Sequence, residues 1–145
     1  MSVSISEVGP TQAWDGLKAS SDAVLVDVRT KAEWSFVGVP DLAALDKAPV
    51  LVEWATLPGM QPNNKFIEGL MTQLDGSAPS EIYFLCRSGA RSMAAAKATA
   101  AAFEDRGTPV RCINVAEGFE GDLDQSRHRG TVNGWKARGL PWNQS

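Results

Sequence analysis

The sequence has few of the residues that build disulfide frameworks and metal sites. Its 145 residues include two cysteines, Cys86 and Cys112, and a single histidine, His128. Two cysteines are too few for a disulfide scaffold or a cysteine-based zinc site. Because His128 has no second type of ligand nearby at a metal-binding spacing, we expect no metal site.

Long apolar runs and an excess of positive charge are also missing. The longest apolar run, residues 82–86, is far too short to cross a bilayer. Residues 1–8 contain neither Lys nor Arg and no apolar segment, so no secretory signal is expected. The formal charge of −3, from 14 basic and 17 acidic residues, argues against sequence-independent binding of nucleic acid. We expect a cytoplasmic protein with reduced thiols that binds neither nucleic acid nor membranes.

Short apolar runs that are typical of buried strands alternate with stretches of helical periodicity. The strand-like runs are residues 23–28, 49–52, 81–86 and 109–115, and the predicted helices are Pro10–Ala19, Phe66–Leu74 and residues 92–106. Residues 54–64 and 118–133 are predicted to be mostly loop. This alternation indicates βαβ units, and therefore an α/β fold with a parallel sheet wrapped by helices. With no internal repeat or linker, we expect one domain over residues 1–145.

Residues 86–92, Cys-Arg-Ser-Gly-Ala-Arg-Ser, stand between the strongest predicted strand and the most helical stretch. In such a loop the backbone N–H groups, together with those of the following helix, can point at one spot and bind anionic atoms. A cysteine at the base of the loop has its thiolate stabilised there, and two neighbouring arginines act in the same direction. We therefore predict that Cys86 is a nucleophile. The predicted substrate-binding residues are Arg87, Ser88, Gly89, Ala90, Arg91 and Ser92.

Individual residues of this loop are expected to have different tasks. Gly89 allows a tight curl of the backbone, and Ser92 is predicted to cap the helix. Arg91 is expected to bind neighbouring carboxylates, whereas Arg87 is expected to project toward the mouth of the site. The alternative is that Cys86 is a small buried hydrophobe at a strand end, as most free cysteines are. The two arginines, the glycine and the immediate helix start favour the nucleophile.

Three motifs together resemble those of the rhodanese-like sulfurtransferases. The loop of residues 86–92 is similar to the active-site loop of that family. The other matching residues are Asp27-Val28-Arg29, Glu33, Trp34 and Gly38 in a first signature, and Gly118, Trp135 and Gly139-Leu140-Pro141 in a closing motif. The sequence departs from the family in two places. Residues 38–42 lack the histidine that often follows the glycine of the first signature, and the stretch between Gly118 and Trp135 is longer than in short family members.

The resemblance implies both a fold and an activity. The implied fold is α/β, with a five-stranded parallel sheet flanked by helices on both faces. The implied enzyme is a thiosulfate sulfurtransferase in which Cys86 accepts a sulfane sulfur from a small anionic donor and holds it as a persulfide. A thiol, cyanide or a protein then accepts the sulfur, and no metal or organic cofactor is implied.

The length of the loop separates this activity from phosphate chemistry. Four residues lie between Cys86 and Arg91, whereas tyrosine phosphatases carry five between their cysteine and arginine. The smaller loop favours a sulfur atom over a phosphoryl group. Two alternatives stay open: a small phosphatase or arsenate reductase on the same fold, and a non-catalytic persulfide-carrier or binding module.

Three charged residues near the first predicted strand are possible supporting residues. We expect Arg29 and Glu33 to form an ion pair four residues apart that fixes the turn after the strand. Asp27 lies at the carboxyl edge of the sheet, where ligands of open α/β sheets bind, and is expected to come closest to the loop. Cys112 is predicted to be a buried structural thiol. His128, between Arg127 and Arg129, lies either in a solvated loop or on a basic rim that attracts an anionic donor.

Overall fold

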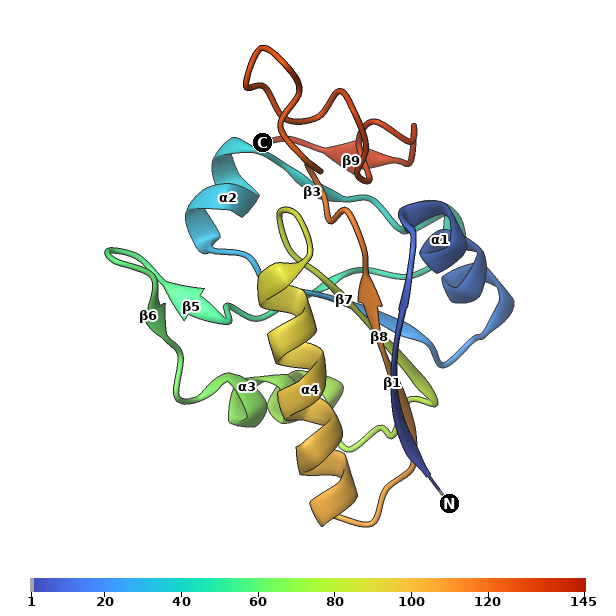
Figure 1. The fold of residues 1–145 in the computed structure, drawn as a ribbon. Helices are drawn as coiled ribbons and strands as arrows, with labels where there is room; N and C mark the ends of the chain where they lie inside the picture. Colours follow the sequence, from blue (N-terminus) through green and yellow to red (C-terminus); the bar gives the residue numbers. More distant parts are fainter. Residues whose placement is uncertain (1) are drawn as a thin grey trace.

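Five parallel strands form the central sheet of the computed structural model, which describes residues 2–145 (Figure 1). This confirms the predicted α/β fold with a five-stranded parallel sheet. The order across the sheet is β1 (Val3–Val8), β8 (Val110–Val115), β7 (Glu81–Leu85), β2 (Val24–Asp27) and β4 (Val50–Leu51). All four neighbouring pairs are parallel, so the carboxyl ends of the strands meet at one edge.

Alternate residues of the central strands point to opposite faces of the sheet, where two separate cores form. Val26 and Phe84, which are register partners in β2 and β7, pack into one core with α3 (Phe66–Leu74) and α4 (Ala90–Asp105). The next pair, Leu25 and Tyr83, faces the second core with α1 (Pro10–Ala19). Helices therefore cover both faces, and Figure 1 shows α4 running along the sheet with α3 beside it.

Most of the remaining elements lie near the carboxyl edge of the sheet, where helix α2 (Lys31–Phe36) follows β2. A short 3-10 turn (Ala43–Leu45) precedes β4 and lies at the opposite edge, where the neighbouring Lys47 donates to the carbonyl of Ala23 over 2.6 Å. Two small antiparallel ribbons complete the fold, formed by β3 (Val39–Pro40) with β9 (Trp142–Asn143) and by β5 (Ala55–Thr56) with β6 (Gln61–Pro62). No helix in residues 2–145 is both long enough and apolar enough to cross a membrane.

The structure confirms most predicted elements, corrects two and adds several that were not predicted, β1, β3 and β9 among them. Helices α1 and α3 have the predicted bounds. The region predicted as loop over residues 54–64 instead contains the β5–β6 ribbon. Helix α4 begins at Ala90, two residues before the predicted start at Ser92, because Gly89 adopts a positive φ of 119° and already serves as the N-cap. Strand β1 was not predicted, since its central residues are mostly polar and exposed.

Two helix-interior glycines lead to opposite predictions for stability. A Cβ at Gly16 in α1 would overlap the hydroxyl of the buried Tyr83, whereas a Cβ at Gly69 in α3 would meet Val52 at 3.5 Å, an ordinary contact. We therefore expect Gly16→Ala to lower the free energy of unfolding by about 1–3 kcal/mol through overpacking. Gly69→Ala should raise it by up to about 1 kcal/mol through helix propensity.

Urea unfolding of the two variants beside the wild type measures both changes. Both substitutions replace a glycine by alanine within a helix, so the gain in helix propensity is the same. The space around each new methyl group therefore decides whether the free energy of unfolding rises or falls. Equal effects of both substitutions would contradict the packing of α1 against Tyr83.

Candidate active site

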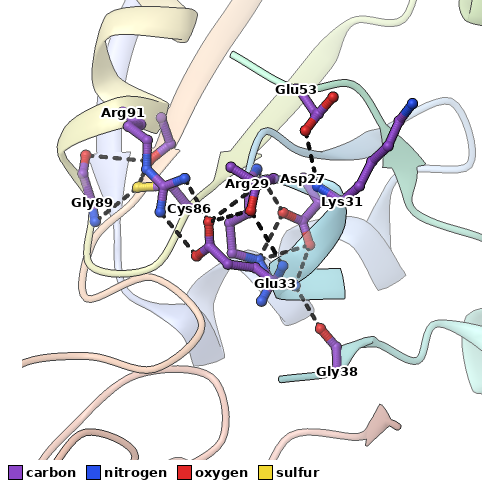
Figure 2. A network of polar contacts seen from close by, with 11 residues as sticks. Asp27, Arg29, Lys31, Glu33, Gly38, Glu53, Cys86, Gly89 and Arg91 are labelled. Atoms are coloured by element: carbon purple, nitrogen blue, oxygen red, sulfur yellow. Dashed lines mark hydrogen bonds and ion pairs between the residues drawn. The ribbon is translucent and has the colours of Figure 1, made fainter. Parts of the chain in front are cut away.

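Cys86 follows directly after β7 and lies at the carboxyl edge of the sheet, in front of the first turn of α4. The backbone N–H of Gly89 donates a hydrogen bond to the Cys86 Sγ over 3.1 Å (Figure 2). The Ser92 Oγ lies 3.2 Å from the same sulfur. Cys86 is only 1% exposed, so the sulfur lies at the bottom of the loop rather than on its rim. A backbone N–H and the N-terminal end of a helix both favour a negative charge on this sulfur.

Arg91 is fixed beside the loop by Glu33 of α2. Its Nη1 and Nη2 donate to the two carboxylate oxygens of Glu33 over 2.7 and 3.0 Å (Figure 2). Glu33 also accepts hydrogen bonds from the N–H and hydroxyl of Thr30, which caps α2. Burial alone would raise the pKa of Glu33, but the hydrogen bonds and charge of Arg91, together with the Thr30 N–H, lower it. The pair therefore joins α2 to the active-site loop.

The predicted ion pair between Arg29 and Glu33 is wrong. Arg29 instead binds Asp27, with 2.6 Å between Nη2 and Oδ2, and both side chains are fully buried. Because α2 begins only at Lys31, residue 29 has no helical neighbour four positions on. Residues 27 and 29 are two apart at the end of a strand, where alternate side chains share a side. The Asp27 carboxylate is consequently paired with Arg29. Glu33, rather than Asp27, contacts the loop through Arg91.

The segment of residues 118–121, placed after β8, holds the backbone of the loop. The Phe119 N–H donates to the carbonyl of Cys86 over 2.8 Å, and the N–H groups of Glu120 and Gly121 donate to the carbonyl of Arg87 over 3.0 and 3.1 Å. Gly118 has a φ of 69°, and a Cβ there would overlap the backbone of residues 86 and 87. Gly118 of the closing motif therefore begins the segment that holds the backbone of Cys86 and Arg87 in place.

Asn114 on β8 is a site residue that the sequence analysis missed. Its Nδ2 donates to the carbonyl of Gly89 over 3.1 Å and to Glu7 of β1 over 2.8 Å, while its Oδ1 lies 2.5 Å from the Ser92 Oγ. Asn114 is 1% exposed and lies in register with Phe84, two residues before Cys86. The sequence did contain a signal for this role, because a polar residue stands there within a run that is otherwise typical of a buried strand. Ser92 points at Asn114 and Cys86 from within α4, so its predicted role as N-cap is wrong.

The other predicted residues lie at different depths. Arg87 and Ala90 are exposed and Ser88 is half-buried, so the rim of the loop is open to solvent. Cys112 is fully buried in the middle of β8, and burial raises the pKa of its thiol to about 12. His128 is exposed in a loop whose backbone is held by the Asp124 carboxylate. Within residues 2–145 no three His, Cys, Asp or Glu side chains gather in a group that could hold a metal ion.

Comparison with known proteins finds relatives that match almost the full length of the chain. No family model matches it. The uncharacterized protein RC0915 of Rickettsia conorii is 34% identical over 140 residues, covering 97% of this chain and 98% of that protein. RP600 of Rickettsia prowazekii, also uncharacterized, is 33% identical over 138 residues, covering 95% and 97%.

Two solved structures share the architecture. The crystal structure of Rv0390 from M. tuberculosis is 45% identical, covers 97% of this chain and 98% of its own, and superposes with a TM-score of 0.82. The solution structure of the polysulfide-sulfur transferase homodimer from Wolinella succinogenes has a TM-score of 0.54 at 17% identity, covering 97% and 80%. This second likeness concerns the fold, which is rhodanese-like.

The pair of Glu33 and Arg91 predicts a pH-dependent contribution to stability. Because the folded protein lowers the pKa of Glu33, the pair stabilises the fold above the ordinary value of 4.5, and this stability is lost as the pH falls below it. Glu33→Gln should lower the free energy of unfolding by about 1.5–3 kcal/mol at pH 7. The difference from the wild type should shrink as the pH falls below 4.5.

Urea unfolding at a series of pH values measures this difference. Glu117→Gln is the matched control, because Glu117 pairs with Arg138, whose side chain is 47% exposed. Such a pair should contribute about 1 kcal/mol or less. A Glu33→Gln effect that is no larger than the control, or that is independent of pH, would contradict the proposed link between α2 and the loop.

Proposed function

The chain has the rhodanese-like fold, and on this premise we propose that it is a sulfurtransferase. The proposed reaction moves a sulfane sulfur from a small anionic donor such as thiosulfate to a thiophilic acceptor, with Cys86 as the carrier. The observation that carries the proposal is the position of the Cys86 sulfur. It lies at the bottom of a six-residue loop, 3.1 Å from the Gly89 N–H and in front of the first turn of α4.

The first half of the proposed reaction loads the cysteine. The Cys86 thiolate attacks the outer sulfur of thiosulfate, a new S–S bond forms, and the bond between that sulfur and the sulfonate sulfur breaks. Sulfite leaves with the electron pair of the broken bond, and a persulfide anion stays on Cys86. The Gly89 N–H and the end of α4 offer hydrogen-bonding and electrostatic stabilisation to the anionic sulfur.

The second half of the proposed reaction unloads it. A nucleophile such as cyanide, or the thiolate of a small molecule or a protein, attacks the outer sulfur of the persulfide. Its bond to that sulfur forms, the S–S bond breaks, and the Cys86 thiolate is regenerated as the leaving group. Electrons and charge balance in both halves, so the cycle needs no added oxidant, reductant or cofactor.

The two arginines of the loop support different parts of this cycle. Arg91 is bound by both oxygens of Glu33 and so contributes a fixed positive charge beside the loop. The Arg87 side chain is exposed, while its backbone carbonyl is held by the N–H groups of Glu120 and Gly121. An exposed guanidinium on a fixed backbone is suited to bind the sulfonate end of a donor at the mouth of the site.

The proposal predicts thiosulfate-dependent formation of thiocyanate from cyanide. Cys86→Ser should abolish this activity and leave the fold intact, because a serine hydroxyl occupies similar space but stays protonated and reacts poorly with sulfur. Polysulfide is the second donor to test, since the fold is shared with a polysulfide-sulfur transferase. Substantial turnover by Cys86→Ser would refute the proposal. Hydrolysis of p-nitrophenyl phosphate without sulfur transfer would favour the phosphatase alternative.

A second prediction concerns donor binding at Arg87. Arg87→Ala should raise the Michaelis constant for thiosulfate by roughly ten- to a hundredfold, as expected for a lost hydrogen bond between charged groups. Its Tm should change little, because the backbone hydrogen bonds from residues 120 and 121 remain. Arg106→Ala, at the opposite end of α4, removes the same charge and is expected to leave the Michaelis constant unchanged. An equal effect of both substitutions would show that general attraction, rather than local binding, is measured.

A further inference from the structure

A chain of hydrogen bonds leads from the sulfur of Cys86 to the edge strand of the sheet. The Ser92 Oγ lies 3.2 Å from Sγ and 2.5 Å from the Asn114 Oδ1, and the Asn114 Nδ2 donates over 2.8 Å to a carboxylate oxygen of Glu7. Cys86, Ser92 and Asn114 are all buried, so water does not replace their missing partners. Each donor in this row of hydrogen-bonded side chains has a fixed number of protons. Not all of the contacts can therefore be hydrogen bonds at the same time.

The orientation of the Asn114 amide is fixed by its neighbours. Its Nδ2 faces two groups that can only accept, the carboxylate of Glu7 and the carbonyl of Gly89. Its Oδ1 therefore faces Ser92 and accepts from the hydroxyl. The carbonyl of Gly89 already accepts from the Met93 N–H and from Asn114, which fills its two lone pairs. The Ser92 Oγ lies 3.2 Å from this carbonyl as well, but because the carbonyl already has two donors, the single Ser92 proton is shared mainly between the Asn114 Oδ1 and the Cys86 Sγ.

We propose that Ser92 and Asn114 form a hydroxyl switch that responds to the charge on Cys86. When Cys86 is a neutral thiol, the Ser92 hydroxyl donates to Asn114, and the thiol proton points to the Ser92 Oγ. When Cys86 is a thiolate, the hydroxyl rotates and donates to Sγ, because a charged acceptor binds a donor more strongly than an amide oxygen does. The proton stays on Ser92 throughout. Asn114 is a positioning residue that acts through Ser92.

The inference rests on the proposed function for its role in the catalytic cycle. In the persulfide the inner sulfur carries two bonds and no charge, so the hydroxyl returns to Asn114. When an acceptor removes the outer sulfur, the inner sulfur leaves as a thiolate and the hydroxyl rotates back to it. The switch thus favours the thiolate at both ends of the cycle, as the attacking group in loading and as the leaving group in unloading.

Other charged groups also surround Cys86, and the test must hold them constant. They lie in the loop itself and on the elements around it. These residues are Arg87 and Arg91 of the loop and α4, Glu33 of α2, Asp27 and Arg29 at the end of β2, Glu7 of β1, and Glu117, which precedes the segment of residues 118–121. Substitutions of Ser92 and Asn114 remove none of these charged side chains. Replacing Asn114 also removes the donor to Glu7 and to the Gly89 carbonyl, and the double variant measures that part of its effect because it lacks the hydroxyl.

The test is the pH dependence of Cys86 alkylation by iodoacetamide, measured by peptide mapping on folded protein. Ser92→Ala should move the midpoint of the profile to higher pH by about one unit, because the thiolate loses a donor. Asn114→Leu should move it to lower pH by a few tenths of a unit, because the hydroxyl loses its nearest acceptor at 2.5 Å and only the Gly89 carbonyl, 3.2 Å away, is left to compete with the thiolate. The double variant should behave like Ser92→Ala, since Asn114 then has no hydroxyl through which to act.

Shifts of both single variants in the same direction, or no shift in Asn114→Leu, would overturn the switch. Asn114→Ala replaces Asn114→Leu if the latter fails to fold, with the same expected direction. The measurement uses no sulfur donor, so its failure is distinguishable from failure of the proposed function. Opposite shifts without sulfur transfer would support the switch alone, and sulfur transfer with parallel shifts would support the function alone.

Discussion

The backbone hydrogen bonds between residues 118–121 and the carbonyls of Cys86 and Arg87 are the constraint on which the site depends. A loop that must surround one sulfur atom needs its backbone held to within tenths of an ångström, and side-chain contacts alone do not provide this. The close approach is possible because residue 118 is glycine, where any Cβ would meet the loop itself. The nucleophile is thereby supported from a segment more than thirty residues away in the sequence.

Phe119 extends this support to the first signature of the sequence. Its ring lies 4.2 Å beneath the guanidinium of the buried Arg29 and 5.2 Å from the Lys136 ammonium. Arg29 in turn binds Asp27 and the carbonyl of Gly38, which fixes the chain on both sides of α2. Cation–π contacts of this kind are stronger when water is excluded. The three motifs recognised in the sequence thus meet at Phe119, whose ring contacts Arg29 and Lys136 and whose N–H binds the Cys86 carbonyl, although they are far apart along the chain.

The elements that local sequence patterns determine were predicted, and the contacts that depend on distant segments were not. The periodicity of apolar residues gave the bounds of α1 and α3, and the β-branched runs located four of the five strands of the sheet. Strand β1 has a polar sequence and exists through its pairing with β8, more than a hundred residues later. Its assignment therefore needs the tertiary structure.

The same distinction applies to the candidate site. The loop of residues 86–92 could be located because its residue types and spacing are local. The partner of Glu33 could not be predicted, because it is Arg91, 58 residues away at the start of α4. The partner of Arg29 was wrongly predicted because the helical turn was expected to include residue 29, whereas α2 begins at Lys31. The role of Asn114 was not predicted for a related reason. A single polar residue in a strand contacts the site only because β8 pairs with β7 in the sheet. The chemistry of the loop could therefore be predicted from the sequence, whereas the partner of Glu33 and the role of Asn114 could not.

The loop held by residues 118–121 is proposed to let Cys86 carry a sulfur atom. Intact-mass analysis of the protein after incubation with thiosulfate, followed by peptide mapping, measures that sulfur directly. We expect a gain of one sulfur atom, located on Cys86 and not on the buried Cys112, that disappears when cyanide is added. A protein that gains no mass from either thiosulfate or polysulfide, or that carries the added sulfur on Cys112, would contradict it.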